Sequence, residues 1–349
     1  MFQSLCEMKV LLILAIFALS ATAAPFEEEV NEHGWHVPQI DGSFIWMTTS
    51  EAENILAKHA KMEEIAGRAW DLSPITYYLY TQSNHYDGQI ITADKDSISN
   101  SNFNANHPTR FIIHGWTQGY KSDMNTMIRD AWLSHGDYNI IVVDWARARS
   151  VEYVSSVSAV PGVGKKVASM IDYLVSNHGL NLDTLEVIGH SLGAQVSGYA
   201  AKNVGSGKIH AIVGLDPAYP LFSYNKPNKR LNSNDAHYVE SIQTCGGKLG
   251  FLKPIGKGAF YPNGGEKQPG CGTDLTGSCS HARSCIYYAE AVRENNFPSM
   301  RCGDYEDAVK KECGGTYSGV KMGAVYNYEF ASGDYYVPVR STAPYGLGN

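Results

Sequence analysis

From Pro74 onward, short apolar runs alternate with longer stretches at helical spacing, and this alternation is the feature that most constrains the fold. The runs are nearly continuous in apolar residues, as expected for strands that are covered on both faces. Because a parallel strand pair needs a long crossover, strands separated by helices indicate a parallel sheet. We therefore predict an α/β fold with a mainly parallel central sheet and helices on both faces. The predicted strands are residues 75–80, 110–116, 139–145, 184–190, 210–216 and 238–244, and the predicted helices are 121–133, 163–177 and 192–203.

One of these strands, residues 184–190, runs directly into the pentapeptide GHSLG at 189–193, and a predicted helix follows it. A strand that turns abruptly into a helix needs glycines where side chains would collide, here Gly189 and Gly193. The serine between them is held up at the carboxyl edge of the sheet. The pentapeptide alone is a weak signal, but its strand and helix context is specific. It predicts the nucleophile elbow of an α/β-hydrolase fold, with Ser191 as the reactive hydroxyl.

A serine hydroxyl becomes a good nucleophile only when a base removes its proton, and that base needs an acid to orient it. In the α/β-hydrolase arrangement the acid and then the histidine follow the serine along the chain. Asp216 ends the next core strand, 25 residues after Ser191, although a capping or turn aspartate is the alternative. For the base we predict His281, which follows a cysteine-constrained loop and opens a helical stretch. His210 lies at the wrong end of its strand, and His237 lies in a polar connection.

The tetrahedral oxyanion of ester hydrolysis needs two donors, usually backbone N–H groups in a dry site. One donor is expected from Leu192, the residue after the nucleophile. The other is expected from Trp116, in a loop where Gly115 permits close backbone approach; an ordinary core tryptophan is the alternative. His190 stands next to the serine, and we expect it to point elsewhere and to be structural. We expect no metal ion and no other cofactor.

The N-terminal residues 1–23 are typical of a secretory signal peptide. An apolar run of eleven residues, 10–20, follows Lys9 and precedes small residues. A membrane anchor is the alternative, but a spanning helix needs about 20 apolar residues, and no second such run follows. We therefore expect a secreted, extracellular protein without a transmembrane segment.

Residues 24–73 form an acidic leader, with apolar residues at roughly helical spacing over 51–70. This leader is either a pro-segment or simply an extra helix. Residues 74–349 are predicted to form a single hydrolase domain. The formal net charge of -7 argues against a nucleic-acid partner, which needs concentrated positive charge.

Cysteine usage fits an oxidising compartment. The chain has 7 cysteines, and removal of the signal peptide takes away Cys6 and leaves six in the last third. An even number in a secreted protein suggests three disulfides, with fifteen possible pairings. A zinc site is the competing interpretation, but the chain has no CxxC pair.

Six motifs occur in an order that resembles the pancreatic-lipase family, including its insect secreted lipases and insect-venom phospholipases A1. They are FIIHGW, VIGHSLGA, GLDPA, FYPNGG, QPGC and CSHARS, and the resemblance spans about residues 74–330. By this resemblance, Ser191, Asp216 and His281 match the family's triad. Trp116 and Leu192 match its oxyanion hole. The family's yolk-protein branch has lost the reactive serine, which is intact here.

Two departures from the digestive members of that family bear on the substrate. Only 68 residues follow His281, so we expect no C-terminal β-sandwich domain and no protein cofactor docked on one. In those digestive members, a segment between two cysteines forms a long helical lid. The matching segment here has seven residues, which is too short to cover a large site. The disulfide expected on this basis is Cys271–Cys279. Apart from the resemblance, we also predict Cys245–Cys285, because it would tie the site loop to the helix after the base, and Cys302–Cys313.

These features predict a serine carboxylester hydrolase that cleaves acyl esters of lipids at an interface through an acyl-enzyme. Phospholipase A1 and neutral-glyceride lipase both remain open as the activity, since short loops favour a bulky head group only indirectly. The alternative from another class is a non-catalytic lipid-binding storage or carrier protein on the same fold. The intact serine, aspartate and histidine count against that alternative.

Overall fold

The computed structural model describes residues 33–66 and 74–348. At its centre lies a ten-stranded sheet in which seven adjacent strands are parallel. These are β5 (Thr109–Ile113), β6 (Asn139–Trp145), β7 (Glu186–His190), β8 (Ala211–Leu215), β9 (Tyr238–Ile242), β10 (Gly258–Pro262) and β12 (Gly333–Val337). The antiparallel strands β3 (Ile75–Tyr80), β4 (Gln89–Ile91) and β11 (Met300–Arg301) lie at the two ends, in the order β11-β12-β10-β9-β8-β7-β5-β6-β3-β4. The predicted α/β-hydrolase fold with a mainly parallel sheet is confirmed.

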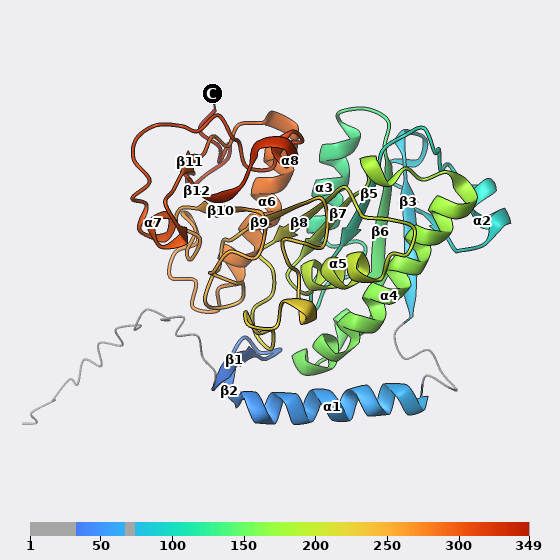
Figure 1. Ribbon diagram of the computed structural model, residues 1–349, viewed down its shortest axis with the longest axis horizontal. Coiled ribbons are helices and arrows are strands. Elements are labelled where there is room, and N and C mark those ends of the chain that lie inside the picture. Colours follow the sequence, from blue (N-terminus) through green and yellow to red (C-terminus); the bar gives the residue numbers. More distant parts are fainter. Residues whose placement is uncertain (1–32, 67–73, 349) are drawn as a thin grey trace, which may run out of the picture.

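Helices cover both faces of the sheet (Figure 1). On β5, Phe111 and Ile113 belong to the core cluster that contains α4 and α5, whereas Ile112 belongs to the cluster that contains α3 and α6. Successive strand residues point to opposite faces, so a strand covered on both sides reads as a continuous apolar run. The helices are α2 (Lys95–Ser99), α3 (Asp123–Leu133), α4 (Tyr153–His178), α5 (Leu192–Asn203), α6 (Ser278–Glu294), α7 (Tyr305–Lys310) and α8 (Asn327–Phe330).

The predicted helix boundaries differ most at α4, which begins ten residues before the predicted start at 163 and contains Pro161. Proline in a helix interior removes one hydrogen bond and is unfavourable by about 3 kcal/mol. For this reason the helix predicted from the sequence begins only after the proline. Tyr153, Val157 and Val160 are buried in the core cluster of that face. Their burial outweighs the local preference and extends the helix.

The N-terminal segment forms a two-stranded hairpin, β1 (Gly34–Pro38) and β2 (Phe44–Thr48), followed by the predicted helix as α1 (Thr49–Ala66). Trp35, Val37 and Met47 of the hairpin are buried in the same core cluster as α4. Figure 1 shows the hairpin and α1 beneath the body of the molecule, beside one end of α4. The expected signal peptide at 1–23 lies outside the described residues. Across 33–66 and 74–348, none of the helices combines the length and apolarity that crossing a bilayer requires.

The cysteines follow the expected pattern in two of three pairs. Disulfides join Cys271 to Cys279 and Cys302 to Cys313. The expected Cys245–Cys285 bond is wrong, because both thiols are free and buried in this structure. The Cys245 sulfur packs against Gly277, since a Cβ atom at that glycine would lie 2.7 Å from the sulfur. The Cys285 sulfur instead lies 3.9 Å from the Ser284 hydroxyl on α6.

Candidate active site

The turn between β7 and α5 is backbone-strained at its centre. Ser191 has φ 55° and ψ −121°, a region that non-glycine residues rarely occupy and that is typical of functional sites. A Cβ atom at Gly189 would lie 2.3 Å from the Gly193 carbonyl oxygen, and one at Gly193 would lie 2.0 Å from the Ile113 carbonyl oxygen. Only glycine fits where β5, β7 and α5 approach this closely. The predicted elbow therefore has the tight packing that its glycines imply.

A buried carboxylate and an imidazole meet beside this turn. The distance between His281 Nδ1 and Asp216 Oδ2 is 2.5 Å. The other carboxylate oxygen accepts backbone N–H groups of Thr244 at 2.7 Å and Cys245 at 3.0 Å. Because an ionised carboxylate only accepts hydrogen bonds, the imidazole carries its proton on Nδ1 and leaves Nε2 as an acceptor. Asp216 is fully buried, and its three partners fix both its position and the orientation of the imidazole.

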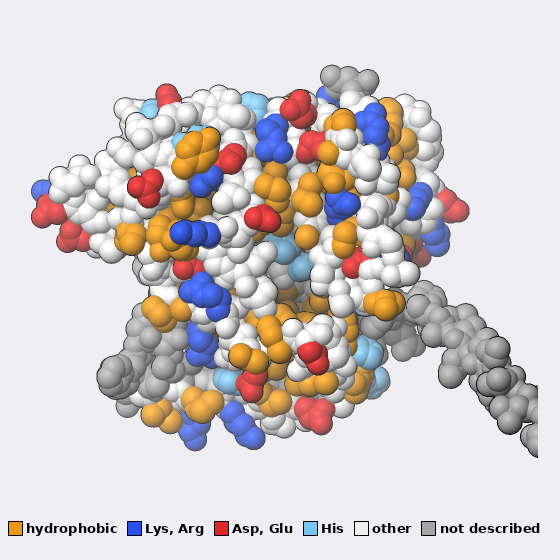
Figure 2. Space-filling model, turned by 180° about the vertical axis from the view of Figure 1, so that it is seen from behind, with side chains coloured by type: hydrophobic (Ala, Val, Ile, Leu, Met, Phe, Trp, Pro, Cys, Tyr) orange, Lys and Arg blue, Asp and Glu red, His pale blue; other side chains and the backbone are white. Residues whose placement is uncertain are grey.

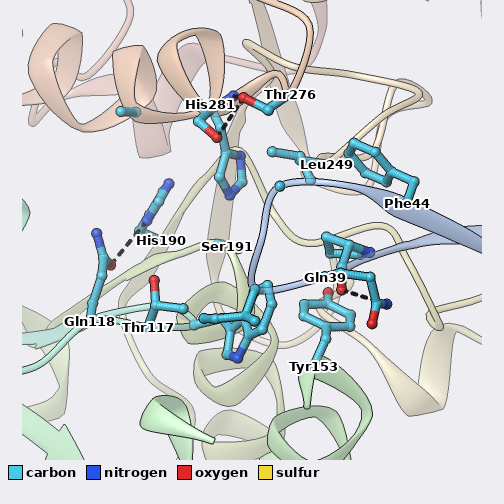
Figure 3. A pocket seen from close by; sticks show the side chains of 16 residues that line it. Gln39, Phe44, Thr117, Gln118, Tyr153, His190, Ser191, Leu249, Thr276 and His281 are labelled. Carbon is cyan, nitrogen blue, oxygen red and sulfur yellow. Dashed lines mark hydrogen bonds between the residues drawn. The ribbon is translucent and has the colours of Figure 1, made fainter. Parts of the chain in front are cut away.

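The imidazole of His281 lies over Ser191 at the top of the elbow (Figure 3). Both side chains belong to the described part of the chain, and in it no hydrogen bond joins the Ser191 hydroxyl to the imidazole. Such bonds are often long in the absence of substrate and tighten in the complex with it. The loop after β5 packs closely against the serine, since a Cβ atom at Gly115 would lie 2.9 Å from the Ser191 Cβ.

His190 does not point away from the site, which corrects the expectation from sequence. Its ring centroid lies 4.5 Å from that of His281, and its Nδ1 lies 3.5 Å from Gln118 Oε1. Burial, together with the neighbouring His281, holds the pKa of His190 well below its usual range, so this ring is neutral. The alternation of side chains along β7 could have revealed this position from the sequence. His190 shares a strand face with Ile188, which packs toward α6 and therefore toward His281.

Two backbone N–H groups near Ser191 match the predicted oxyanion donors. Leu192 is the first residue of α5, so its N–H has no acceptor within the helix. In the loop after β5, the neighbours of Trp116 are both engaged: Gly115 N–H donates to Gln118 Oε1 at 3.0 Å, and Thr117 N–H donates to the Ala148 carbonyl at 2.7 Å. Within 33–66 and 74–348, neither the Trp116 N–H nor the Leu192 N–H has a protein acceptor. They are the two predicted donors.

A network of polar contacts, which sequence reasoning missed, runs from buried His114 through Asp144 to exposed Arg149 and holds the loop after β5. His114 Nε2 lies 3.0 Å from Asp144 Oδ1, and Arg149 donates to the same oxygen at 2.6 Å. Burial opposes the charge on Asp144, but the hydrogen bonds from His114 and Arg149 prevail and lower the pKa of this carboxyl. The indole N–H of Trp145 donates to the His114 carbonyl at 2.9 Å. These contacts make the loop a rigid support for Gly115 and Trp116.

A pocket of about 300 Å³ opens above Ser191 and His281. Figure 2 shows a hollow on this face of the molecule with histidine side chains inside it. The Trp116 indole forms part of the wall, edge-on to Tyr153 at 5.2 Å, and donates to the Ser150 carbonyl at 2.8 Å. The N-terminal hairpin forms another part of the wall, where Figure 3 shows Gln39 and Phe44, and its lining residues are Pro38, Gln39, Ile40, Gly42 and Phe44.

A family model described as Lipase matches residues 42–345. This chain belongs to the lipase family. It is 32% identical over 269 residues to the pancreatic triacylglycerol lipase of Myocastor coypus, covering 70% of this chain and 59% of that protein. It is 33% identical over 262 residues to the phospholipase A1 of Vespa crabro, covering 68% of this chain and 83% of that protein. A similarity of 35% over 236 residues, 61% of this chain and 47% of the relative, links it to a putative endothelial lipase of Crotalus adamanteus.

This lipase-family chain spans little more than half the length of the pancreatic relatives that it matches. Among solved structures it is similar to Est1E from Butyrivibrio proteoclasticus, with 15% identity and a TM-score of 0.26 over 41% of this chain and 46% of that one. Ser191, Asp216 and His281 all lie inside the range matched by the family. In the part of the chain that the structure describes, no group of three or more His, Cys, Asp and Glu side chains is arranged to hold a metal ion.

Proposed function

We propose that this lipase-family chain is a secreted serine hydrolase that cleaves acyl esters of lipids through an acyl-enzyme. The observation that carries the proposal is the 2.5 Å contact between His281 and buried Asp216 beside the strained Ser191. A pocket with aromatic walls above these residues supports an apolar substrate. Two disulfides and the apolar segment at 10–20 support secretion.

In the first half of the reaction, Ser191 Oγ attacks the ester carbonyl carbon while His281 Nε2 accepts the hydroxyl proton. The N–H groups of Trp116 and Leu192 donate to the resulting oxyanion. The bond from the acyl carbon to the alcohol oxygen then breaks, and His281 returns the proton to the departing alcohol. Water repeats the sequence and releases the fatty acid. Asp216 keeps its hydrogen bond to the imidazole throughout and stabilises the imidazolium.

The substrate is either a phospholipid or a neutral glyceride, and relatives are named for each of these activities. The loop between Cys271 and Cys279 spans only eight positions from one bridged residue to the other, which leaves room for a bulky polar head group. This loop supports phospholipid as the substrate, and the aromatic wall is compatible with either class.

A fluorophosphonate probe followed by peptide mapping tests the reaction type, and we expect a single adduct on Ser191. Fatty-acid release from phosphatidylcholine and from triolein then identifies the substrate class. Release from triolein alone would eliminate the phospholipase activity. Failure of the probe to label Ser191 in folded protein would favour the lipid-binding storage or carrier alternative instead.

A further inference from the structure

The two faces of the N-terminal hairpin contact different parts of the molecule. Trp35, Val37 and Met47 lie on one face and are buried in the core cluster that contains α4. Pro38 and Phe44 lie on the other face, directly opposite each other in the register of β1 and β2, and both line the pocket. Because the buried face anchors the hairpin, its second face is a fixed part of the pocket wall.

Phe44 lies where the hairpin meets the disulfide loop, which we define as residues 272–278. A Cβ atom at Gly42 in the hairpin turn would lie 3.2 Å from a side-chain methyl group of this loop. The Lys248 ammonium lies 5.5 Å from the centroid of the Phe44 ring and donates to the Leu275 carbonyl in the same loop. The position of the ring therefore depends on both the hairpin and the disulfide loop.

The pocket has an apolar side and a polar side around Ser191 and His281. On one side Figure 3 labels Gln39, Phe44, Tyr153 and Leu249, and on the other it labels Thr117, Gln118 and His190. On the first side, the Gln39 amide and the Tyr153 hydroxyl donate to backbone carbonyls. An acyl chain gains free energy by leaving water for an apolar surface, so it fits this side. The alcohol part of the ester fits the polar side.

We propose that the hairpin face formed by Pro38 and Phe44 binds the acyl chain of the substrate and makes the protein favour medium-length chains over acetyl groups. The proposal rests on the proposed function, because the wall acts on an ester that reacts with Ser191. A longer chain buries more of this surface than an acetyl group does. Pro38 precedes residue 42, where the match to the lipase family begins, so β1 lies outside the matched range.

Hydrolysis of monomeric p-nitrophenyl acetate and p-nitrophenyl octanoate by the full chain tests the proposal. We expect Phe44→Ala to lower kcat/KM for the octanoate about tenfold, because the longer chain loses apolar contact with the ring. The same variant should leave kcat/KM for the acetate within about threefold of wild type. Phe44→Leu keeps an apolar side chain and should recover most of the activity on the octanoate.

The matched control is Trp46→Ala, which removes an aromatic ring from the same strand face. Trp46 is 46% exposed, and its ring centroid lies 5.0 Å from that of His36. In the part of the chain that the structure describes, Trp46 does not line the pocket. We expect kcat/KM within about threefold of wild type for both esters. A loss of preference for the octanoate as large in Trp46→Ala as in Phe44→Ala would overturn the proposal.

The remaining outcomes separate the acyl wall from the chemistry. Equal losses on both esters in Phe44→Ala would assign the ring to support of the catalytic geometry, which overturns the wall and leaves the proposed function standing. A gain on the octanoate would show that the ring obstructs the chain and would also overturn the wall.

Failure of the wild-type chain to hydrolyse either ester would overturn the proposed function, and calorimetric binding of octanoate then tests the wall by itself. Octanoate binding that Phe44→Ala weakens about tenfold and Trp46→Ala leaves unchanged would support the wall. Equal octanoate binding by wild type and Phe44→Ala would overturn it.

Discussion

Buried charged groups lie beside a cavity at both edges of the central sheet. The cavity volume is about 300 Å³ at the carboxyl edge and about 250 Å³ at the amino edge. At the amino edge, Glu240 accepts hydrogen bonds from the Tyr238 hydroxyl, the Gly323 N–H and the Asn327 amide, at 2.8–2.9 Å. These contacts tie a C-terminal loop to the sheet. All three donors come from this chain, and the surroundings of the carboxylate are those of a structural group.

Glu186 at the same edge follows this pattern. It accepts the Tyr288 hydroxyl at 2.6 Å and faces Arg110 at 3.5 Å. At the carboxyl edge, Asp216 is equally well bonded, but its chain of contacts ends at an imidazole nitrogen that faces the pocket beside the strained Ser191. The comparison teaches that a buried charge alone does not mark a catalytic site. The carboxyl edge adds a strained Ser191 and an imidazole that lines the pocket, and these two features support the proposed catalytic role.

The largest expected effect comes from Ser191→Ala. It should lower ester turnover at least about 10⁴-fold, because only the oxyanion donors and substrate binding remain. The thermal unfolding midpoint should stay unchanged, since the substitution removes one hydroxyl at a site with free volume. Initial rates and a melting curve measure both. Ser169→Ala, on an exposed part of α4, is the matched control, and turnover near that of wild type in both variants would contradict the triad.

Exchange of one carboxylate at each edge sharpens the comparison. Asp216→Asn should lower kcat about 10⁴-fold, because the amide no longer holds the imidazole in its working tautomer. Glu186→Gln should leave kcat within about threefold and instead lower the free energy of unfolding by about 1–3 kcal/mol, through weaker bonds to Tyr288 and Arg110. Kinetics and urea titration on both variants provide the measurement. Similar kinetic losses would mean that the two edges do not differ in role.

Glu240→Gln should change how stability depends on pH. Burial raises the pKa of Glu240 from 4.5 to about 7. Between these values the native state holds a proton that the unfolded state has released, so stability from this group is present below about pH 4.5 and is lost as pH rises toward 7. The loss amounts to about 3 kcal/mol. Urea midpoints at pH 5 and 7.5 should differ less in Glu240→Gln than in wild type, and an unchanged difference would refute the raised pKa.

His190 should have a smaller, geometric effect at the carboxyl edge. His190→Ala removes the ring that packs against His281 and should reduce kcat about tenfold, because a looser imidazole spends less time in the reactive orientation. His190→Phe keeps a ring of similar shape and should restore kcat to within about threefold of wild type. The kcat and KM of both variants decide this. A loss as large in the phenylalanine variant would assign His190 a chemical role.

The two free thiols give the smallest expected effect. Burial raises the pKa of Cys245 and raises that of Cys285 to about 12, so neither should react with iodoacetamide in the native protein. After unfolding in denaturant without reductant, both positions should be alkylated, as mapped by peptide mass. Finding a peptide in which Cys245 and Cys285 are cross-linked would restore the disulfide expected from sequence.

The parts of the fold that follow a local pattern were predictable. Strands such as 139–145 and the helix at 192–203 appear at the predicted positions, because apolar periodicity reflects a neighbourhood of a few residues. β10 and β12 were not foreseen. β12 pairs with β10 across 75 residues of sequence, from Gly258 to Gly333, and no local pattern shows such a pairing. The hairpin at 34–48 was missed for a similar reason, since its role depends on packing against α4.

For this protein, the sequence by itself determined the α/β class, the elbow and the order of serine, aspartate and histidine, because strand endings and glycine positions are local properties. Only the tertiary structure decided that His190 packs on His281, that Cys245 and Cys285 stay apart, and that the N-terminal hairpin forms a wall of the pocket. Contacts between residues far apart in the chain depend on how helices and strands pack together, and no short stretch of sequence contains that information.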